Sequence, residues 1–123
     1  MQTDQNTTVA DLRNLMAAFV AERHWQKYHT PRNLAASISI EAGELLELFQ
    51  WADNEAAVER LKKDEAYKRA CGEELADVLM YVMSLANALE MDVAQTVQAK
   101  MVKNRKKYPA EEFKGHYERP LRE

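Results

Sequence analysis

The stretch "SIEAGELLELFQW", Ser39 to Trp51, is typical of a helix whose apolar side is interrupted by an acid. On a helical wheel of about 100° per residue, five apolar residues gather on roughly a third of the circumference: Leu34, Ile38, Leu45, Leu48 and Phe49. Glu41 lies inside this arc, and Glu44 lies at its edge. Because an unpaired buried carboxylate loses several kcal/mol of solvation, these acids need a compensating partner.

A second helical stretch repeats the arrangement. Glu74 falls at the centre of an apolar stripe that includes Val78 and Leu85, and Asp77 falls at its edge. Neither stripe contains a lysine or arginine that could neutralise the acids. Four carboxylates converging from two helices would repel one another, and a divalent cation with oxygen ligands, such as Mg²⁺, Mn²⁺ or Ca²⁺, would relieve that repulsion.

Two other interpretations of the acids remain open at this point. E-x-x-E is common on solvated helix faces, where the acids bind nothing. A di-iron carboxylate bundle also uses inward-facing glutamates, but its ligand helices carry Glu-x-x-His. No histidine follows a glutamate at that spacing in this sequence.

Composition predicts an all-α fold in one domain. The chain has 123 residues with 46% hydrophobic and 30% charged side chains, and only three glycines and three prolines. So few turn-forming residues favour long helices over many short strands. We expect a single domain over 1–123, with flexible ends at 1–8 and 110–123, built as a bundle of four to five helices.

Capping residues and prolines set the expected helix boundaries. Thr7 or Thr8 can cap a helix over 9–28, and Pro31 opens a second helix over about 31–51. A turn is expected at 52–54. The next segment is predicted to be mostly helical with a polar joint, and its strongest helix covers 73–89. Asp92 is expected to cap a last helix that ends near 107, before Pro109.

Charge and cysteine content limit the partners and the compartment. A net charge of −3 gives no general attraction to nucleic acid or anionic membranes. No stretch reaches the ~18 apolar residues of a membrane span, and the N-terminus does not resemble a signal peptide. The single cysteine, Cys71, cannot form an internal disulfide. We therefore expect a cytoplasmic protein that binds neither nucleic acid nor membrane.

Several blocks together resemble one known family. Glu41-x-x-Glu44 followed by Glu74-x-x-Asp77 resembles the E-x-x-E…E-x-x-D signature of MazG-like all-α nucleoside triphosphate pyrophosphohydrolases. The blocks "FVAERHWQKYHTPRNLAASISIEAGELLELFQW", "EELADVLMYVMSLA" and "KMVKNRKKYP" are similar, in the same order, to those of the dCTP pyrophosphatase branch. The similarity covers about 11–109, which is most of the chain.

The resemblance implies an activity and an assembly. The family hydrolyses a (deoxy)nucleoside triphosphate, here dCTP or a modified dCTP, to the monophosphate and pyrophosphate, and thereby cleans the nucleotide pool. The reaction depends on Mg²⁺, with Mn²⁺ as the alternative ion. The resemblance also implies a homodimer or homotetramer.

The resemblance also assigns roles to individual residues. It implies that Glu41, Glu44, Glu74 and Asp77 bind the metal, and that Glu44 helps to deprotonate or position the attacking water. The residues that it places at the substrate are Trp25, His29, Trp51, Lys100, Asn104 and Tyr108.

Two positions depart from the family pattern, and other functions remain alternatives. Ile40 stands where the longer MazG form has an acid, and Met16 stands where some dCTP-preferring members have a histidine. The main alternative is a non-catalytic helical oligomer that binds nucleotide or a protein partner. A third interpretation takes the basic block "KMVKNRKKY" as an RNA-binding patch, and a solvated basic face is its simplest explanation.

Overall fold

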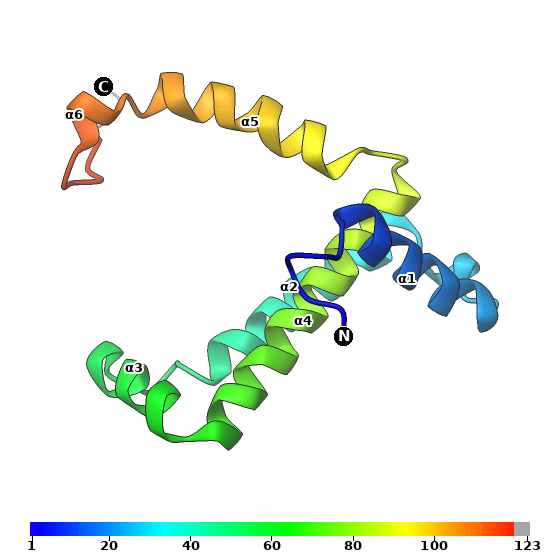
Figure 1. Ribbon diagram of the computed structural model, residues 1–123, viewed down its shortest axis with the longest axis horizontal. Coiled ribbons are helices and arrows are strands. Elements are labelled where there is room, and N and C mark those ends of the chain that lie inside the picture. The colour runs from blue at the N-terminus through cyan, green and yellow to red at the C-terminus, as the bar shows by residue number, and fades with distance from the viewer. Residues whose placement is uncertain (120–123) are drawn as a thin grey trace. The chain divides into compact units, whose positions relative to one another are not determined.

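The computed structural model describes residues 1–119 and is helical throughout its regular structure (Figure 1). The helices are α1 (Val9–Glu22), the 3₁₀-helix η1 (Gln26–Tyr28), α2 (Pro31–Glu47), α3 (Asn54–Lys63), α4 (Glu65–Ala88), α5 (Val93–Lys107) and α6 (Ala110–Phe113). The described residues contain no strand, so the predicted all-α class is confirmed. None of their helices is both long and apolar enough to cross a bilayer.

The chain forms two compact units. The first covers Met1–Met91 and contains α1 to α4, and the second begins at Asp92 and contains α5 and α6. The expected flexible end at 110–123 lies partly outside the described residues, and within them α6 follows Pro109.

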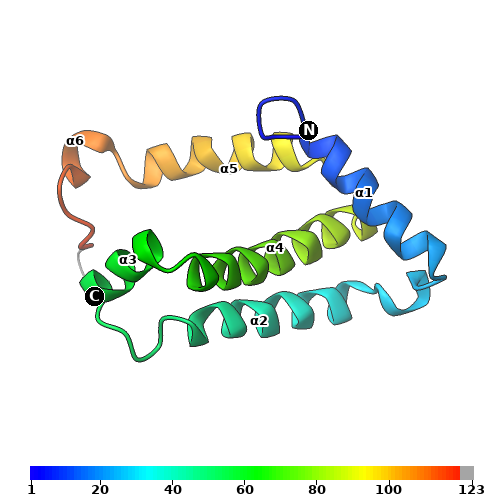
Figure 2. The ribbon, with the colours of Figure 1, turned by 60° about the horizontal axis from the view of Figure 1, so that its bottom comes forward.

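The first unit is organised around α2 and α4, which pack side by side in opposite directions (Figure 2). Leu34 of α2 is buried in this packing at 2% exposure. Near the other end of α2, the buried Tyr67 of α4 donates a hydrogen bond from its hydroxyl to the carbonyl of Leu48 at 2.7 Å. Phe49 packs edge-on against the Tyr67 ring. These contacts hold the two acid-bearing helices in register.

The first helix is fastened to the far end of α4 by a pair of side chains. The Arg13 Nε donates to the Asn87 side-chain oxygen at 2.9 Å, and the Asn87 amide donates to the Arg13 carbonyl at 3.0 Å. A capping box between Thr8 and Asp11 begins α1, as the sequence predicts for Thr8. The α1 helix is therefore fixed at its start and along its packed side.

The prediction of one helix over 9–28 is wrong after Glu22. The His24 backbone takes a left-handed conformation with φ of 53°, and the Trp25 N–H donates to the Val20 carbonyl at 3.1 Å. This is a Schellman ending, in which a glycine is usual, and here a histidine occupies the left-handed position. The chain then forms η1 before Thr30 caps α2 and Pro31 begins it.

Two further helix boundaries differ from the prediction. The α2 helix ends at Glu47, and turns occupy 48–51. The α4 helix begins at Glu65 rather than near 73, because the Asp64 carboxylate caps it by accepting from the Tyr67 N–H. Gly72 lies inside α4 without breaking it. The predicted last helix, capped by Asp92 and ending at Lys107, is confirmed as α5.

Candidate metal centre

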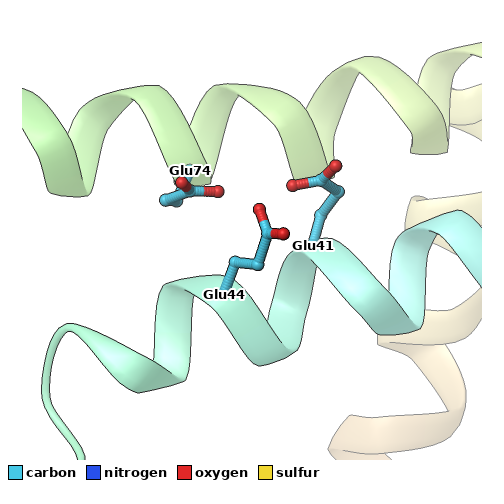
Figure 3. A group of neighbouring side chains, drawn as sticks. All are labelled: Glu41, Glu44 and Glu74. Atoms are coloured by element: carbon cyan, nitrogen blue, oxygen red, sulfur yellow. The ribbon is translucent and has the colours of Figure 1, made fainter.

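Three carboxylates meet between α2 and α4. Glu41 and Glu44 project from one side of α2 because residues three apart share a helix face, and Glu74 projects from α4 toward them (Figure 3). One oxygen from each carboxylate lies within 4.8 Å of the others. Glu41 and Glu74 are half-buried and Glu44 is exposed, so the group opens to solvent on the Glu44 side.

The electrostatics of this group favour a bound cation. Burial raises the pKa of Glu41 to about 7, and the neighbouring charges of Glu44, Asp77 and Glu74 add to the effect. Burial, followed by the Glu44 charge, likewise raises the pKa of Glu74. The Oε2 atoms of Glu41 and Glu74 are buried and accept no hydrogen bond. Buried acceptors without donors, all of them carboxylate oxygens, fit a hard divalent cation such as Mg²⁺.

Asp77 stands beside the three glutamates rather than within the tight group. It is half-buried on α4, one turn after Glu74, and its charge contributes to the raised pKa of Glu41. The same side chain lines a cavity of about 490 Å³. Asp77 is therefore both a neighbour of the acid group and part of the wall of this adjoining cavity, which we call the Asp77 cavity.

Aromatic and sulfur-containing side chains form most of the Asp77 cavity. The lining residues are Leu15, Met16, Phe19, Trp25, His29, Asp77, Met80 and Tyr81. Phe19 meets Trp25 edge-to-face with ring centroids 5.9 Å apart, and the Arg23 guanidinium lies 3.7 Å from the Phe19 centroid. A hollow lined by aromatic rings beside a group of acids can hold a planar base next to a metal-bound phosphate chain.

The structure places Trp25 and His29 in the wall of this cavity. Both are among the residues that the resemblance assigns to the substrate. Sequence reasoning did not single out Tyr81 and Phe19 as site residues. Tyr81 lies one turn after Asp77 on the same face of α4, so the spacing could have identified it. Phe19 shares a face of α1 with Leu15 and Met16, which line the same cavity, but the sequence does not show that this face meets α4.

None of the other four expected substrate residues is among those that line the Asp77 cavity. Trp51 lies in the turn after α2 and is 90% exposed. Lys100, Asn104 and Tyr108 belong to the second unit, where they follow one another at helical spacing along α5 and its end. Asn104 is half-buried, and the Tyr108 ring packs edge-on against Phe113 at 5.2 Å.

Comparison with known proteins finds relatives that align with most of this chain. The chain is 43% identical over 109 residues to dCTP pyrophosphatase 1 of Mus musculus, an alignment that covers 88% of this chain and 63% of that protein. Human dCTP pyrophosphatase 1 is 44% identical over 104 residues, covering 84% and 60%. The chain thus spans less than two thirds of the length of these curated relatives.

A solved structure gives the same result for the fold. The crystal structure of a pyrophosphatase from Archaeoglobus fulgidus superposes with a TM-score of 0.76 at 40% identity, covering 89% of this chain and 99% of that one. The model of the MazG-like family matches residues 36–119, which include all four acids. The chain therefore belongs to the MazG-like family.

Proposed function

We propose that this protein is a Mg²⁺-dependent pyrophosphohydrolase that converts a deoxynucleoside triphosphate, dCTP or a modified dCTP, to the monophosphate and pyrophosphate. The observation that carries the proposal is the convergence of Glu41, Glu44 and Glu74, with two buried oxygens that no donor satisfies. The names of the relatives from mouse and human and of the archaeal pyrophosphatase support the reaction class.

Each acid has a defined part in this proposal. Glu41, Glu44, Glu74 and Asp77 would hold Mg²⁺, with Mn²⁺ as a substitute. The bound ion supplies neutralisation of the triphosphate charge and a lowered pKa for the attacking water. Glu44 is the exposed member of the group, so its second oxygen is available to orient that water or accept its proton.

The Asp77 cavity would hold the nucleoside end of the substrate. Its Trp25 and Tyr81 rings offer surfaces for a base, and stacking on an aromatic side chain contributes ~1–3 kcal/mol per base. His29 offers a polar group at the cavity wall. Lys100, Asn104 and Tyr108 are proposed to hold the phosphates, because a lysine supplies a point charge for phosphate oxygens. Trp51 is proposed to lie beside the base.

The proposal includes assembly as a homodimer or homotetramer in the cytoplasm. Large apolar side chains are widely exposed on the single chain, including Leu75, Leu79 and Trp51. Such exposure is typical of surfaces that associate. Cys71 is free and buried, which fits a reducing compartment. Neither nucleic acid nor membrane is proposed as a partner.

A nucleotide panel tests the proposal. The protein is incubated with each deoxynucleoside triphosphate and Mg²⁺, with and without EDTA, and pyrophosphate and monophosphate are quantified. We expect both products in equal amounts, greatest for dCTP or a modified dCTP, and none with EDTA. No turnover of any nucleotide would favour the alternative of a non-catalytic binding oligomer, and salt-sensitive RNA retention in its place would favour the RNA-binding alternative.

A further inference from the structure

Two buried polar atoms outside the acid group also lack partners. Within the part of the chain that the structure describes, the buried side-chain atoms with no hydrogen bond are Glu41 Oε2, Glu74 Oε2, His29 Nδ1 and Ser84 Oγ. A cation would satisfy the two carboxylates, but it would not satisfy the other two atoms. Both His29 and Ser84 line one cavity of about 530 Å³, which we call the Ser84 cavity. Its volume lies within the roughly 300–1,000 Å³ range of small-molecule sites.

The Ser84 cavity is distinct from the proposed substrate site. It lies among α1, α4 and the segment that leads into α2, and none of the four acids lines it. It shares only Met16 and His29 with the Asp77 cavity. Ser84 itself is 6% exposed. A buried hydroxyl and a buried ring nitrogen at the same hollow are costly unless something completes their hydrogen bonds.

The lining defines the chemistry of an occupant. Its apolar part includes Val20, Pro31 and three alanines, and its amide groups come from Gln26 and Asn87. The Asn87 side chain is already bonded to Arg13 through both its oxygen and its nitrogen. No lysine, arginine or carboxylate lines the cavity, so a phosphate would find no counter-charge there. A neutral, largely flat molecule with a few donors and acceptors would be complementary.

We propose that the Ser84 cavity binds an uncharged nucleoside, with its base between the apolar walls and a polar edge toward Ser84 and His29. The choice of a nucleoside among neutral heterocycles rests on the proposed function, because a nucleotide hydrolase works amid such molecules. The cavity is then a second site, which adjoins the triphosphate site at Met16 and His29 and is independent of the metal.

The test is a titration of the full chain with deoxycytidine in EDTA, followed through ¹³C-labelled alanine and methionine methyl groups. Ala17, Ala21 and Ala88 line only the Ser84 cavity, and Met80 lines only the Asp77 cavity. We expect the three alanine signals to shift saturably at millimolar deoxycytidine. Ala88→Leu, which fills the cavity, should abolish the shifts, and Ser84→Ala should weaken binding about tenfold through the lost hydrogen bond.

Two controls make the outcome decisive. Met80→Leu alters only the Asp77 cavity and should leave the alanine shifts unchanged. Ser84→Ala removes a single oxygen, so it remains informative even where Ala88→Leu fails to fold. Three results would overturn the proposal. They are shifts confined to Met80, unchanged affinity in Ser84→Ala, and no alanine shifts up to about 10 mM deoxycytidine, a concentration at which weak ligands bind. Because binding is measured without turnover, failure of the proposed enzymatic function would be seen separately in the nucleotide panel.

Discussion

Glu41 combines burial with three acidic neighbours, and this combination makes it the most informative single residue. The sequence predicted its inward position, because the apolar arc of one helix contains it. The raised pKa of about 7 could not be predicted from the helix alone, since it depends on Glu74 and Asp77 approaching from α4. A helical wheel shows which side chains share a face of one helix. The distance from that face to the acids of a second helix is known only once the fold is known.

A neutral residue at position 41 is expected to stabilise the metal-free protein at high pH. The pKa of Glu41 is raised from an ordinary 4.5 to about 7 in the folded state. Its contribution is therefore fully present below about 4.5 and is lost as pH rises through about 7. Glu41→Gln should have a higher Tm than the wild type at pH 8 in EDTA, and the difference should shrink toward pH 5. Glu47→Gln, on the same helix, serves as the control, and a lower Tm for Glu41→Gln at pH 8 would contradict the sign.

Removing a carboxylate of the acid group is expected to abolish turnover while leaving the helices intact. Glu74→Gln removes the charge of a proposed ligand oxygen, and metal-based charge stabilisation is worth several kcal/mol, so kcat/KM should fall at least about 100-fold. Circular dichroism should be unchanged. Glu47→Gln, an exposed acid outside the group, should retain activity. Wild-type rates in Glu74→Gln would exclude the proposed metal centre.

At the scale of helices, capping residues predicted most starts, and the sequence failed mainly at helix ends. Thr8 and Asp92 cap the helices that follow, as predicted, and α2 begins at the predicted Pro31, where Thr30 is the cap. The end of α1 was missed because His24 occupies the position where glycine is the usual signal. The early start of α4 was missed because its first two turns are polar on most sides, and helicity there depends on Asp64 and packing of Tyr67.

A glycine at position 24 is expected to stabilise the protein. The left-handed conformation costs an L-residue roughly 1–2 kcal/mol, whereas glycine adopts it freely, with some loss through greater freedom in the unfolded chain. The net gain for His24→Gly should be about 0.5–1 kcal/mol in urea unfolding. Glu90→Gly, at the equivalent turn after α4 with φ of 52°, should behave in the same way. His24→Val should destabilise, and equal stability of the two His24 variants would show that the turn is not strained.

At the scale of the molecule, the exposed apolar surface of the single chain stands out. Leu75, Leu79 and Val82 lie on one face of α4 at helical spacing and are each more than a third exposed. Glu74 and the packing against α2 occupy a neighbouring face, about a quarter turn around the helix. Broad apolar sides were evident in the sequence, but the sequence alone did not show which stripe is covered within the chain and which remains outward.

A charge on this outward stripe is expected to disrupt assembly. Leu79→Glu would bury an uncompensated carboxylate in an interface formed by the stripe, so light scattering after size exclusion should report a smaller species than the wild type. Leu79→Met keeps the volume and apolarity and should keep the wild-type mass. An unchanged mass for Leu79→Glu would show that copies associate through another surface.

The Schellman turn that ends α1 has a consequence for how the protein can change over evolution. The turn that ends the helix places the Trp25 indole edge-to-face against Phe19. Both rings line the Asp77 cavity, so the end of α1 also forms part of the cavity wall. A sequence change that lets α1 continue by one more turn would move the indole away without touching any acid. Such a change would alter the proposed base-binding wall while leaving the acid group intact.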